Sequence, residues 1–354
     1  MKTKSAVVIG GCGFIGAHCV ARLMREGFQV LCIDNLSRVT AQANVAWLRE
    51  IALNTPGALD YVYADVRHPD ELEAVLDDSV RQRGRPEVVF HQAAQVTVTL
   101  SMTEPRHDFE NNALGTFNVL EAVRSFCPEA LLVFSSTNKV YGSLKHLETR
   151  EEEKRYAFQH VAGVGTDQPL DFYSPYGCSK GAADQYVRDY SRIYGLRTLV
   201  FRQSCIYGSR QFGHEDQGWV AWFVIAALLG LPTTIYGTGK QVRDLLWIDD
   251  LLDAYWSAWQ AEVSGEIFNI GGGPENTLSL LELLDILKEL SPSLHASAQL
   301  AWRPGDQPIY VSDIRDLNTR LGWAPKVPPL EGVHRLWAWV NDNQAEIAAM
   351  IRKT

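Results

Sequence analysis

The sequence of 354 residues lacks any apolar run that could cross a membrane, and it lacks an excess of basic residues. No stretch approaches the roughly 18 apolar residues of a membrane span. The apolar run that follows the first lysines is too short for a signal peptide, and a buried strand explains it better. A net charge of −9 argues against a nucleic-acid or anionic-membrane surface. We expect a cytoplasmic protein with neither partner.

The six cysteines include no C-x-x-C pair, and no group of cysteines and histidines has the spacing of zinc ligands. We interpret them as reduced thiols of a cytosolic protein, and we expect no metal site. Hydrophobic residues make up 46% of the chain, which is ample for a core. The length suits two domains, or one large α/β unit with a smaller lobe.

Short apolar runs alternate with amphipathic stretches up to about residue 203. This β-α-β alternation predicts an α/β fold with a Rossmann-type, doubly wound parallel sheet. Glycine, proline and tryptophan are frequent afterwards, so we place one domain at 1–203 and a smaller α/β lobe at 204–354. The alternative is that part of 241–270 returns to the first domain. The charged run 149–155 is predicted as a solvated loop or a short exposed helix. The predicted strands are 6–10, 28–34, 61–65, 87–94, 130–136 and 197–202, and the predicted helices are 14–27, 112–126, 176–195 and 279–290.

A glycine-rich turn joins the first predicted strand to the first helix, with Gly10, Gly13 and Gly16 in a G-x-x-G-x-x-G spacing. Glycines there let the backbone approach a pyrophosphate, and the helix N-terminus directs free N–H groups at the phosphates. Asp34 ends the second strand, where a carboxylate binds ribose hydroxyls and repels a 2′-phosphate. This favours NAD over NADP, although Arg38 nearby weakens the preference.

Further candidate cofactor contacts flank this turn and the strand ends. An aspartate at a strand end, such as Asp65, often serves only as a cap or turn. Asn112 is predicted as a contact to the backbone or to the cofactor, and a helix cap explains it equally well. His91 is better explained as a structural residue beside the cofactor than as a catalyst. The other predicted contacts are Phe14, Ile15, Asn35, Ser37, Val66, Ala93 and Ala94.

Tyr176 and Lys180 stand at i and i+4 of a predicted helix, so their side chains share one face. The pKa of a free tyrosine is about 10, which is too high for a base at neutral pH. A nearby ammonium and an oxidised nicotinamide both favour the phenolate. The pair is therefore a candidate for proton transfer and cofactor binding.

These motifs together resemble the extended short-chain dehydrogenases/reductases of the nucleotide-sugar epimerase and dehydratase group. The similarity covers nearly the whole chain, including "HQAA" (91–94), "NALGT" (112–116), "SSTNKVYG" (135–142), "SPYGCSK" (174–180), "GKQVRD" (239–244) and "RPGDQ" (303–307). The resemblance implies NAD as cofactor and a nucleotide sugar as substrate. It also implies that Thr137 bonds the reacting hydroxyl, Tyr176 is the base, and Lys180 holds the nicotinamide ribose.

Asn138 and Lys139 distinguish between reactions within this family. In sugar 4,6-dehydratases the two positions are typically Asp and Glu, the acid and base that remove water. An amide and an ammonium cannot supply that pair, so dehydration is disfavoured. Oxidation followed by reduction, without elimination, remains.

Two longer stretches, 170–186 and 207–223, resemble the subgroup of CDP-tyvelose 2-epimerases, also called CDP-paratose 2-epimerases. This similarity implies a CDP-linked hexose or deoxyhexose that is inverted at carbon 2 through a transient keto-sugar. Residue chemistry alone identifies neither cytosine nor carbon 2. The alternatives are a UDP-sugar 4-epimerase or related oxidoreductase, and an NAD-binding regulator without turnover.

Arg243 and Arg303 match arginines that bind the substrate diphosphate in the family, since arginine forks suit pyrophosphate oxygens. Cys205 stands where many members carry an asparagine on the sugar phosphate, so that contact is in doubt. Trp219 is either an aromatic surface for the ligand or part of the core. Two helices, 112–126 and 176–195, are candidates for the contacts of a homodimer or homotetramer. The complete set of predicted substrate contacts is Gln95, Thr137, Asn138, Lys139, Cys205, Arg210, Gln211, Trp219, Arg243, Arg303 and Asp306.

Overall fold

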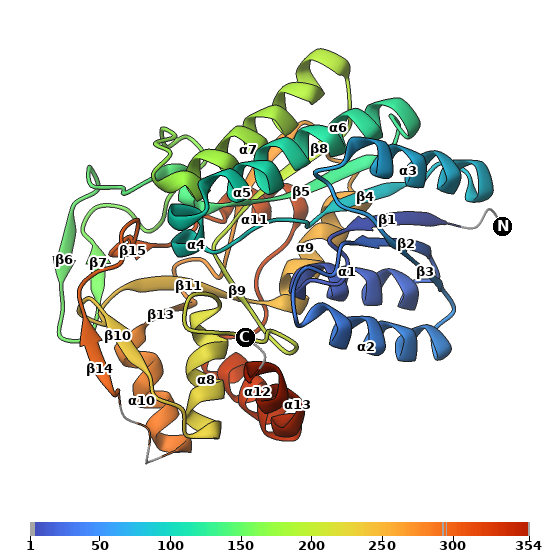
Figure 1. Cartoon of the computed structure of the whole chain (residues 1–354). Helices are drawn as coiled ribbons and strands as arrows, with labels where there is room; N and C mark the ends of the chain where they lie inside the picture. The colour runs from blue at the N-terminus through green and yellow to red at the C-terminus, as the bar shows by residue number, and fades with distance from the viewer. Residues whose placement is uncertain (1–3, 292–293, 295, 353–354) are drawn as a thin grey trace.

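A seven-stranded sheet forms the centre of the computed structural model, which describes residues 4–291, 294 and 296–352 (Figure 1). Its strand order is β12-β8-β5-β4-β1-β2-β3, and every neighbouring pair is parallel. The predicted doubly wound parallel sheet is therefore confirmed. The strands are β1 (Ser5–Ile9), β2 (Gln29–Asp34), β3 (Ala58–Tyr63), β4 (Val88–His91), β5 (Leu131–Thr137), β8 (Thr198–Gln203) and β12 (Glu266–Ile270).

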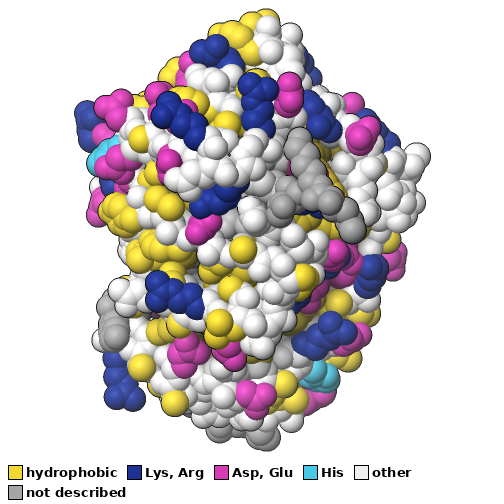
Figure 2. Space-filling model, turned by 90° about the vertical axis from the view of Figure 1, so that its right-hand side faces the viewer, with side chains coloured by type: hydrophobic (Ala, Val, Ile, Leu, Met, Phe, Trp, Pro, Cys, Tyr) yellow, Lys and Arg dark blue, Asp and Glu magenta, His cyan; other side chains and the backbone are white. Residues whose placement is uncertain are grey.

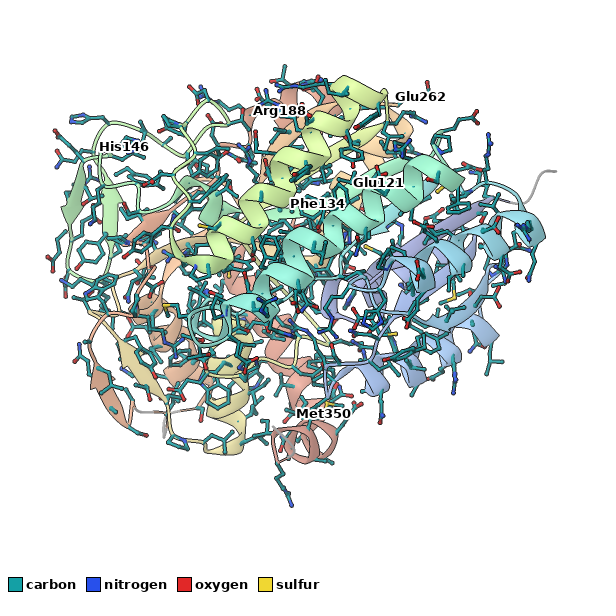
Figure 3. All side chains as sticks on the ribbon, turned by 45° about the horizontal axis from the view of Figure 1, so that its top comes forward. Glu121, Phe134, His146, Arg188, Glu262 and Met350 are labelled. Carbon is teal, nitrogen blue, oxygen red and sulfur yellow. The ribbon has the colours of Figure 1, made fainter. Side chains whose placement is uncertain are left out.

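Both faces of this sheet are buried, which explains why its strands read as continuous apolar runs. Successive side chains of β1 point to opposite faces: Ala6 and Val8 belong to one core, and Val7 and Ile9 to the other. The first core packs under α1 (Phe14–Arg25), α2 (Ala41–Leu53) and α9 (Ile248–Gln260). The second packs under α3 (Pro69–Arg83), α6 (Gly115–Phe126) and α7 (Ser174–Tyr194), with α6 and α7 side by side (Figures 1 and 3).

The helix predicted at 112–126 differs at its start. Before α6 the chain forms α4 (Val98–Thr103), α5 (Pro105–Phe109) and a π-helical turn, η1 (Glu110–Leu114). The Thr116 hydroxyl donates to the Asn112 carbonyl at 2.6 Å, so a side chain competes for a carbonyl that a regular α-helix would use.

The second lobe is built on two small sheets, in which β11 pairs with β9, β13 and β15, and β10 pairs with β14. The chain crosses between the lobes, because α9 and β12 lie with the large sheet. The boundary at residue 203 stays a prediction. The elements of this part are β9 (Cys205–Tyr207), α8 (Trp219–Leu229), β10 (Thr234–Tyr236), β11 (Val242–Trp247), β13 (Thr277–Ser279), α10 (Leu280–Leu290), β14 (Ala298–Leu300), β15 (Ile309–Tyr310), α11 (Arg315–Leu321), α12 (Pro329–Asp342) and α13 (Gln344–Ile351).

The charged run 149–155 was predicted only in part. Residues 152–155 form a loop as predicted, but 149–151 form the strand β6 (Thr149–Glu151), which pairs with β7 (Tyr156–Phe158) in a β-hairpin. Its charges pair with the second lobe: Glu151 accepts from Lys240 at 2.7 Å, and Arg155 bonds Glu282 at 2.6 Å. These partners are distant in sequence, which local patterns do not reveal. The hairpin thereby closes one side of the second lobe.

The surface carries mixed charge. On the face shown in Figure 2, acidic and basic side chains are interspersed. In the part of the chain that the structure describes, no helix has the length and apolar character needed to cross a membrane. Those same residues contain no cluster of histidine, cysteine, aspartate and glutamate suited to a metal ion.

Candidate active site

The glycine turn lies at the carboxyl end of β1, where a parallel sheet opens its ligand crevice. Gly10 has φ +79°, and a Cβ there would collide with the backbone of Ala93. A Cβ on Gly16 would collide with the Gly10 carbonyl, so the turn packs against itself and admits only glycine. The Asp34 carboxylate accepts the backbone N–H groups of Cys12 and Leu36, both at 2.8 Å, and ties the turn to the end of β2.

A small cavity of about 70 Å³ lies beside this turn. Asp65 does not offer it a free oxygen, because the carboxylate accepts from Arg67 at 2.7 Å and Asn35 at 2.8 Å. Burial raises the pKa of Asp65, but these bonds outweigh it and hold the pKa below its ordinary value. Asp65 therefore positions Asn35, and its predicted adenine contact stays a prediction. The cavity is lined by Gly10, Gly13, Asp34, Asn35, Ser37, Arg38, Val66, Ala93 and Ala94, among others.

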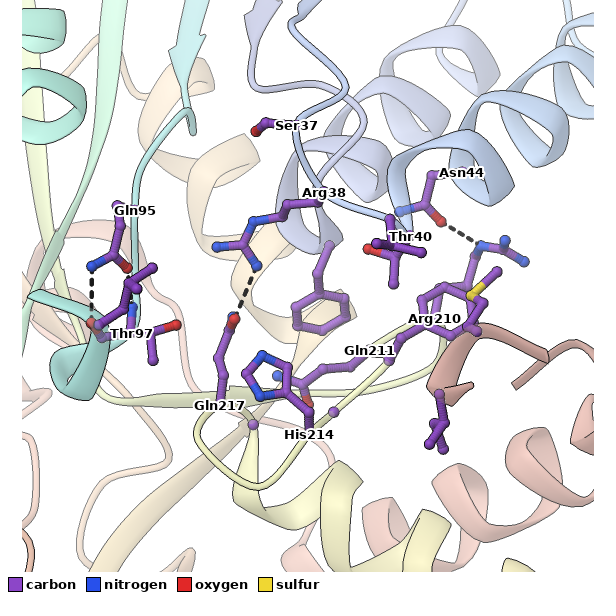
Figure 4. A pocket seen from close by; sticks show the side chains of 18 of the residues that line it. Ser37, Arg38, Thr40, Asn44, Gln95, Thr97, Arg210, Gln211, His214 and Gln217 are labelled. Carbon is purple, nitrogen blue, oxygen red and sulfur yellow. Dashed lines mark hydrogen bonds between the residues drawn. The ribbon is translucent and has the colours of Figure 1, made fainter. Parts of the chain in front are cut away.

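A larger cavity of about 410 Å³ continues from this end of the crevice (Figure 4). Arg38 donates across it to the Gln217 side chain at 2.9 Å, and so links the loop after β2 to the loop before α8. Phe14 and Gln95 also line it, whereas Ile15 packs against the core.

Arg210 and Gln211 lie in the wall of this cavity, as Gln95 does. The Arg210 guanidinium donates to Asn44 at 2.9 Å and stacks over Trp47 at 4.9 Å. Gln211 donates to the Ile206 carbonyl at 3.1 Å. Arg210 is thus engaged by the protein, whereas the buried Gln211 Oε1 has no hydrogen-bond partner among the described residues. The predicted substrate contacts of both residues stay predictions.

Thr137, Tyr176 and Lys180 come together where β5 ends and α7 begins. The Thr137 hydroxyl lies close enough to the Tyr176 phenol to lower its pKa, and it accepts the Lys139 backbone N–H at 3.3 Å. The Lys180 ammonium donates to the Ser135 carbonyl at 2.6 Å and lies 4.2 Å from the centre of the Phe134 ring (Phe134 is labelled in Figure 3).

Burial controls the protonation of this set. It raises the pKa of Tyr176 to about 12, against the bond from Thr137 and the positive charge of Arg38. It also lowers the pKa of Lys180 to about 7. The expected lowering of the phenol pKa is thus not achieved by the protein groups alone, and a further positive charge is needed.

Asn112 links the Gln95 backbone to Ser179 of α7, the helix that carries Tyr176 and Lys180. Fully buried, it accepts the Gln95 backbone N–H and donates to the Gln95 carbonyl, both at 2.9 Å. It also donates to Asp108 and Ser179, so its amide is used within the protein. The predicted backbone contact of Asn112 is therefore confirmed, whereas its cofactor contact stays a prediction. His91 bonds the Thr116 hydroxyl at 2.9 Å, and burial lowers its pKa to about 3, which agrees with a structural role.

A third cavity, of about 310 Å³, is lined by Lys139, two residues after Thr137, and by residues of the second lobe. Arg243 pairs with Asp306 at 3.4 Å, and Arg303 pairs with Asp216 at 3.0 Å. Three cations of the protein, from Lys139, Arg243 and Arg303, line this one cavity. It shares Gln217 and Gly218 with the 410 Å³ cavity, so the crevice is continuous from the glycine turn to the second lobe.

Cys205 acts on this cavity through Trp219. Its sulfur accepts the Trp219 indole N–H at 3.1 Å, and Trp219 lines the cavity. Burial raises the pKa of the Cys205 thiol to about 12, so it stays neutral. The thiol therefore fixes an aromatic wall, whereas the predicted substrate contact of Cys205 itself stays untested.

Sequence reasoning missed two glutamines of the site. Gln217 holds Arg38, and Gln307 accepts from the Lys139 ammonium at 3.3 Å. Both lie in motifs that the family resemblance covers, "GHEDQG" and "RPGDQ". That resemblance was the signal in the sequence that could have identified them. Their partners are far away in sequence, so only the fold reveals what they bind.

Known enzymes resemble this chain in sequence and in structure. Residues 6–271 match the model of the NAD dependent epimerase/dehydratase family. The chain is 40% identical over 343 residues to CDP-paratose 2-epimerase of Salmonella typhi, covering 95% of this chain and 98% of that protein. The structure resembles UDP-glucose 4-epimerase of Thermotoga maritima with UDP-glucose, with a TM-score of 0.80, 29% identity and coverage of 96% and 99%. It also resembles the dTDP-glucose 4,6-dehydratase DesIV of Streptomyces venezuelae with NAD and TYD bound, with a TM-score of 0.83, 27% identity and coverage of 98% and 99%. The similarity extends over both lobes.

Proposed function

This chain belongs to the NAD dependent epimerase/dehydratase family, and we propose that it inverts carbon 2 of a CDP-linked hexose or deoxyhexose. It is an NAD-dependent nucleotide-sugar epimerase. The observation that carries the proposal is the pair Asn138 and Lys139 directly after Thr137, where the family's dehydratases place two carboxylates. The related CDP-paratose 2-epimerase supports the choice of base and carbon.

The residues present fit NAD as the cofactor. Gly10, Gly13 and Gly16 have no Cβ, so the backbone of the turn can approach a pyrophosphate, and Asp34 ends the strand beside it. Arg38, which lines the cavity beside this turn, is close enough to Tyr176 for its positive charge to lower the pKa of the phenol. Bound NAD supplies the hydride acceptor of the first half-reaction and the hydride donor of the second. Its pyridinium charge is also the additional positive charge that would bring the Tyr176 pKa toward neutrality.

In the proposed mechanism, Thr137 orients the sugar hydroxyl and the Tyr176 phenolate takes its proton while the carbon loses a hydride. The resulting ketone stays in the crevice and presents its other face. Tyr176 then returns the proton to the new alkoxide, so the reaction has no net redox change. Arg243 and Arg303 hold the diphosphate during this rotation, since bidentate guanidinium groups suit phosphate oxygens.

A UDP-sugar 4-epimerase is the second candidate, favoured by the structural similarity to a UDP-glucose 4-epimerase. It would use the same Thr137, Tyr176 and Lys180, and only the base and the orientation of the sugar would differ. A regulator without turnover is disfavoured, because Thr137, Tyr176 and Lys180 are all present, and Thr137 lies close enough to Tyr176 to lower the pKa of the phenol.

The proposal also covers the oligomeric state and the cellular compartment. Phe117 of α6 and Tyr186 of α7 are 38% and 49% exposed and pack on each other edge to face. Pairing of these helices between copies would bury the two rings, so we propose a homodimer or homotetramer.

All six cysteines are free thiols, including Cys12 and Cys32 with sulfur atoms 3.7 Å apart, which fits a reducing cytoplasm.

The experiment is proton NMR of the purified enzyme incubated with CDP-paratose, CDP-glucose and UDP-glucose in separate samples. We expect a CDP-sugar inverted at carbon 2. A carbon-4 epimer, above all from UDP-glucose, would move the protein to the second candidate. A 4-keto-6-deoxy product would refute the interpretation of Asn138 and Lys139.

A further inference from the structure

Lys139 joins the catalytic residues to the second lobe through its backbone. It lies in the 3-10 turn η2 (Asn138–Tyr141), where its N–H donates to the Thr137 hydroxyl at 3.3 Å. A Cβ on Gly177 would lie 3.3 Å from the Lys139 carbonyl, so the same peptide packs on the first turn of α7 beside Tyr176. The position of Lys139 is therefore fixed relative to both catalytic hydroxyls.

The side chain of Lys139 reaches the opposite wall. Its ammonium donates to the Gly305 carbonyl and the Gln307 side chain, both at 3.3 Å. Both bonds are long, and both acceptors are neutral. Among the described residues, no carboxylate forms an ion pair with it. An ammonium has three N–H donors, so one remains for another oxygen in the cavity that Lys139 lines.

The electrostatics of this ammonium are unfavourable without a ligand. Burial lowers the pKa of Lys139 to about 8, and the repulsion from Arg243 adds to the shift while Asp306 opposes it. A buried cation that the protein neutralises so incompletely has a free-energy cost. An oxygen-rich ligand in the cavity would reduce that cost.

We infer that Lys139 is the binding residue that retains the keto-sugar between the two half-reactions, by donating to an oxygen of the sugar ring or its substituents. The inference rests on the proposed function. Arg243 and Arg303 already serve the diphosphate, whereas Lys139 alone among the three cations is bonded to the catalytic threonine. The grip on the sugar is thereby coupled to the group that binds the reacting hydroxyl.

The retention has a redox consequence. In the first half-reaction the sugar C–H and O–H bonds break and a C=O bond forms, with the hydride passing to NAD and the proton to Tyr176. The second half-reaction reverses each transfer. If the ketone leaves between them, one reduced cofactor and one protonated tyrosine stay on the enzyme, and that active site cannot start another cycle.

The test uses the holoenzyme with Lys139→Met, which keeps the length of the side chain and removes its donors. Reduced nicotinamide is followed by absorbance and the released keto-sugar by mass spectrometry, while turnover of a CDP-sugar proceeds. We expect at least about ten-fold fewer turnovers before inactivation, the effect of one hydrogen bond from a charged donor. Reduced cofactor should approach one per active site. Lys139→Arg should restore part of the retention, and the exposed Lys145→Met should behave as wild type.

Unchanged turnover without reduced cofactor in Lys139→Met would overturn the inference. If the wild type epimerises none of the sugars, the proposed function fails, and the affinities for CDP and CDP-glucose then test Lys139 separately. Weaker binding of CDP-glucose alone would support a grip on the sugar. Equal weakening of both ligands would place Lys139 on the diphosphate and overturn the inference. Cofactor content and thermal unfolding show whether each variant is folded.

Discussion

At the scale of single residues, Tyr176 carries the chemistry with a phenol whose pKa burial raises to about 12. Tyr176→Phe removes the proton acceptor, so we expect turnover to fall by roughly 10²–10⁴-fold. Binding of NAD should be unchanged, because Asp34 and Lys180 remain. Tyr186→Phe on the same helix is the matched control, since that ring is 49% exposed. Steady-state kinetics and a titration with NAD give both quantities, and near-normal turnover of Tyr176→Phe would contradict the assignment.

Arg38 is the second residue-scale prediction. Its guanidinium lines both cofactor cavities and bonds Gln217, so it brings positive charge to the crevice that would receive a dinucleotide diphosphate. We expect Arg38→Gln to weaken NAD binding by about ten-fold, the effect of one charged hydrogen bond. Calorimetric titration measures this, with Arg81→Gln on the exposed face of α3 as the control. Wild-type affinity in Arg38→Gln would show that the arginine only links two loops.

Individual residues were predictable where their role depends on neighbours in the sequence. Gly10 and Asp34 follow from a turn and a strand end, and the Tyr176–Lys180 pair follows from helix spacing. The partners of Arg210 and Asn112, which are Asn44 and Gln95, could not be predicted, because only the fold brings them together. The sequence shows which hydrogen bonds and ion pairs a side chain can form. Which residue forms them with it is known only from the fold.

At the scale of elements, a buried ion pair fixes α7 against the sheet. Asp184 of α7 accepts two bonds from Arg202 of β8, both at 2.9 Å, and a third from Ser136 of β5 at 2.7 Å. Asp184→Ala would leave the buried Arg202 charge without a carboxylate, with only the neutral Tyr141 hydroxyl as partner. We expect a loss of about 3–5 kcal/mol in the free energy of unfolding. Denaturant titration measures it.

The matched control is Asp77→Ala, which breaks the exposed i,i+4 pair with Arg81 on α3. We expect the control to lose less than about 1 kcal/mol. Equal effects of the two substitutions would show that the Asp184–Arg202 pair does not hold α7.

Helices and strands were predictable where the pattern that specifies them lies in neighbouring residues of the sequence. The buried strands of the large sheet read as apolar runs, and α7 was placed within two residues at its start, 174 against 176. The strand β6 was missed because its charged residues are satisfied by Lys240 and other groups of the second lobe. Periodicity detects an element's buried face, and β6 is exposed on both sides.

At the scale of the whole molecule, two buried histidines make the fold sensitive to acid. Burial lowers the pKa of His18 to about 4 and that of His91 to about 3. Both values lie below the value of about 6.5 in the unfolded chain. Between those limits only the unfolded chain binds the proton, so stability is complete above about pH 6.5 and falls as the pH decreases.

We expect each histidine to reduce the free energy of unfolding by about 2 kcal/mol between pH 7 and pH 5, since 1.5 pKa units correspond to that amount. His91→Asn keeps a polar partner for Thr116 and removes the titration. The variant should therefore lose about 2 kcal/mol less than wild type over this interval, even if it is less stable at pH 7. Denaturant titrations at the two pH values measure the difference, which cancels every other titrating group. An identical pH dependence in both proteins would mean that His91 accepts a proton in the folded state, and that its bond to Thr116 does not hold it neutral beneath the crevice.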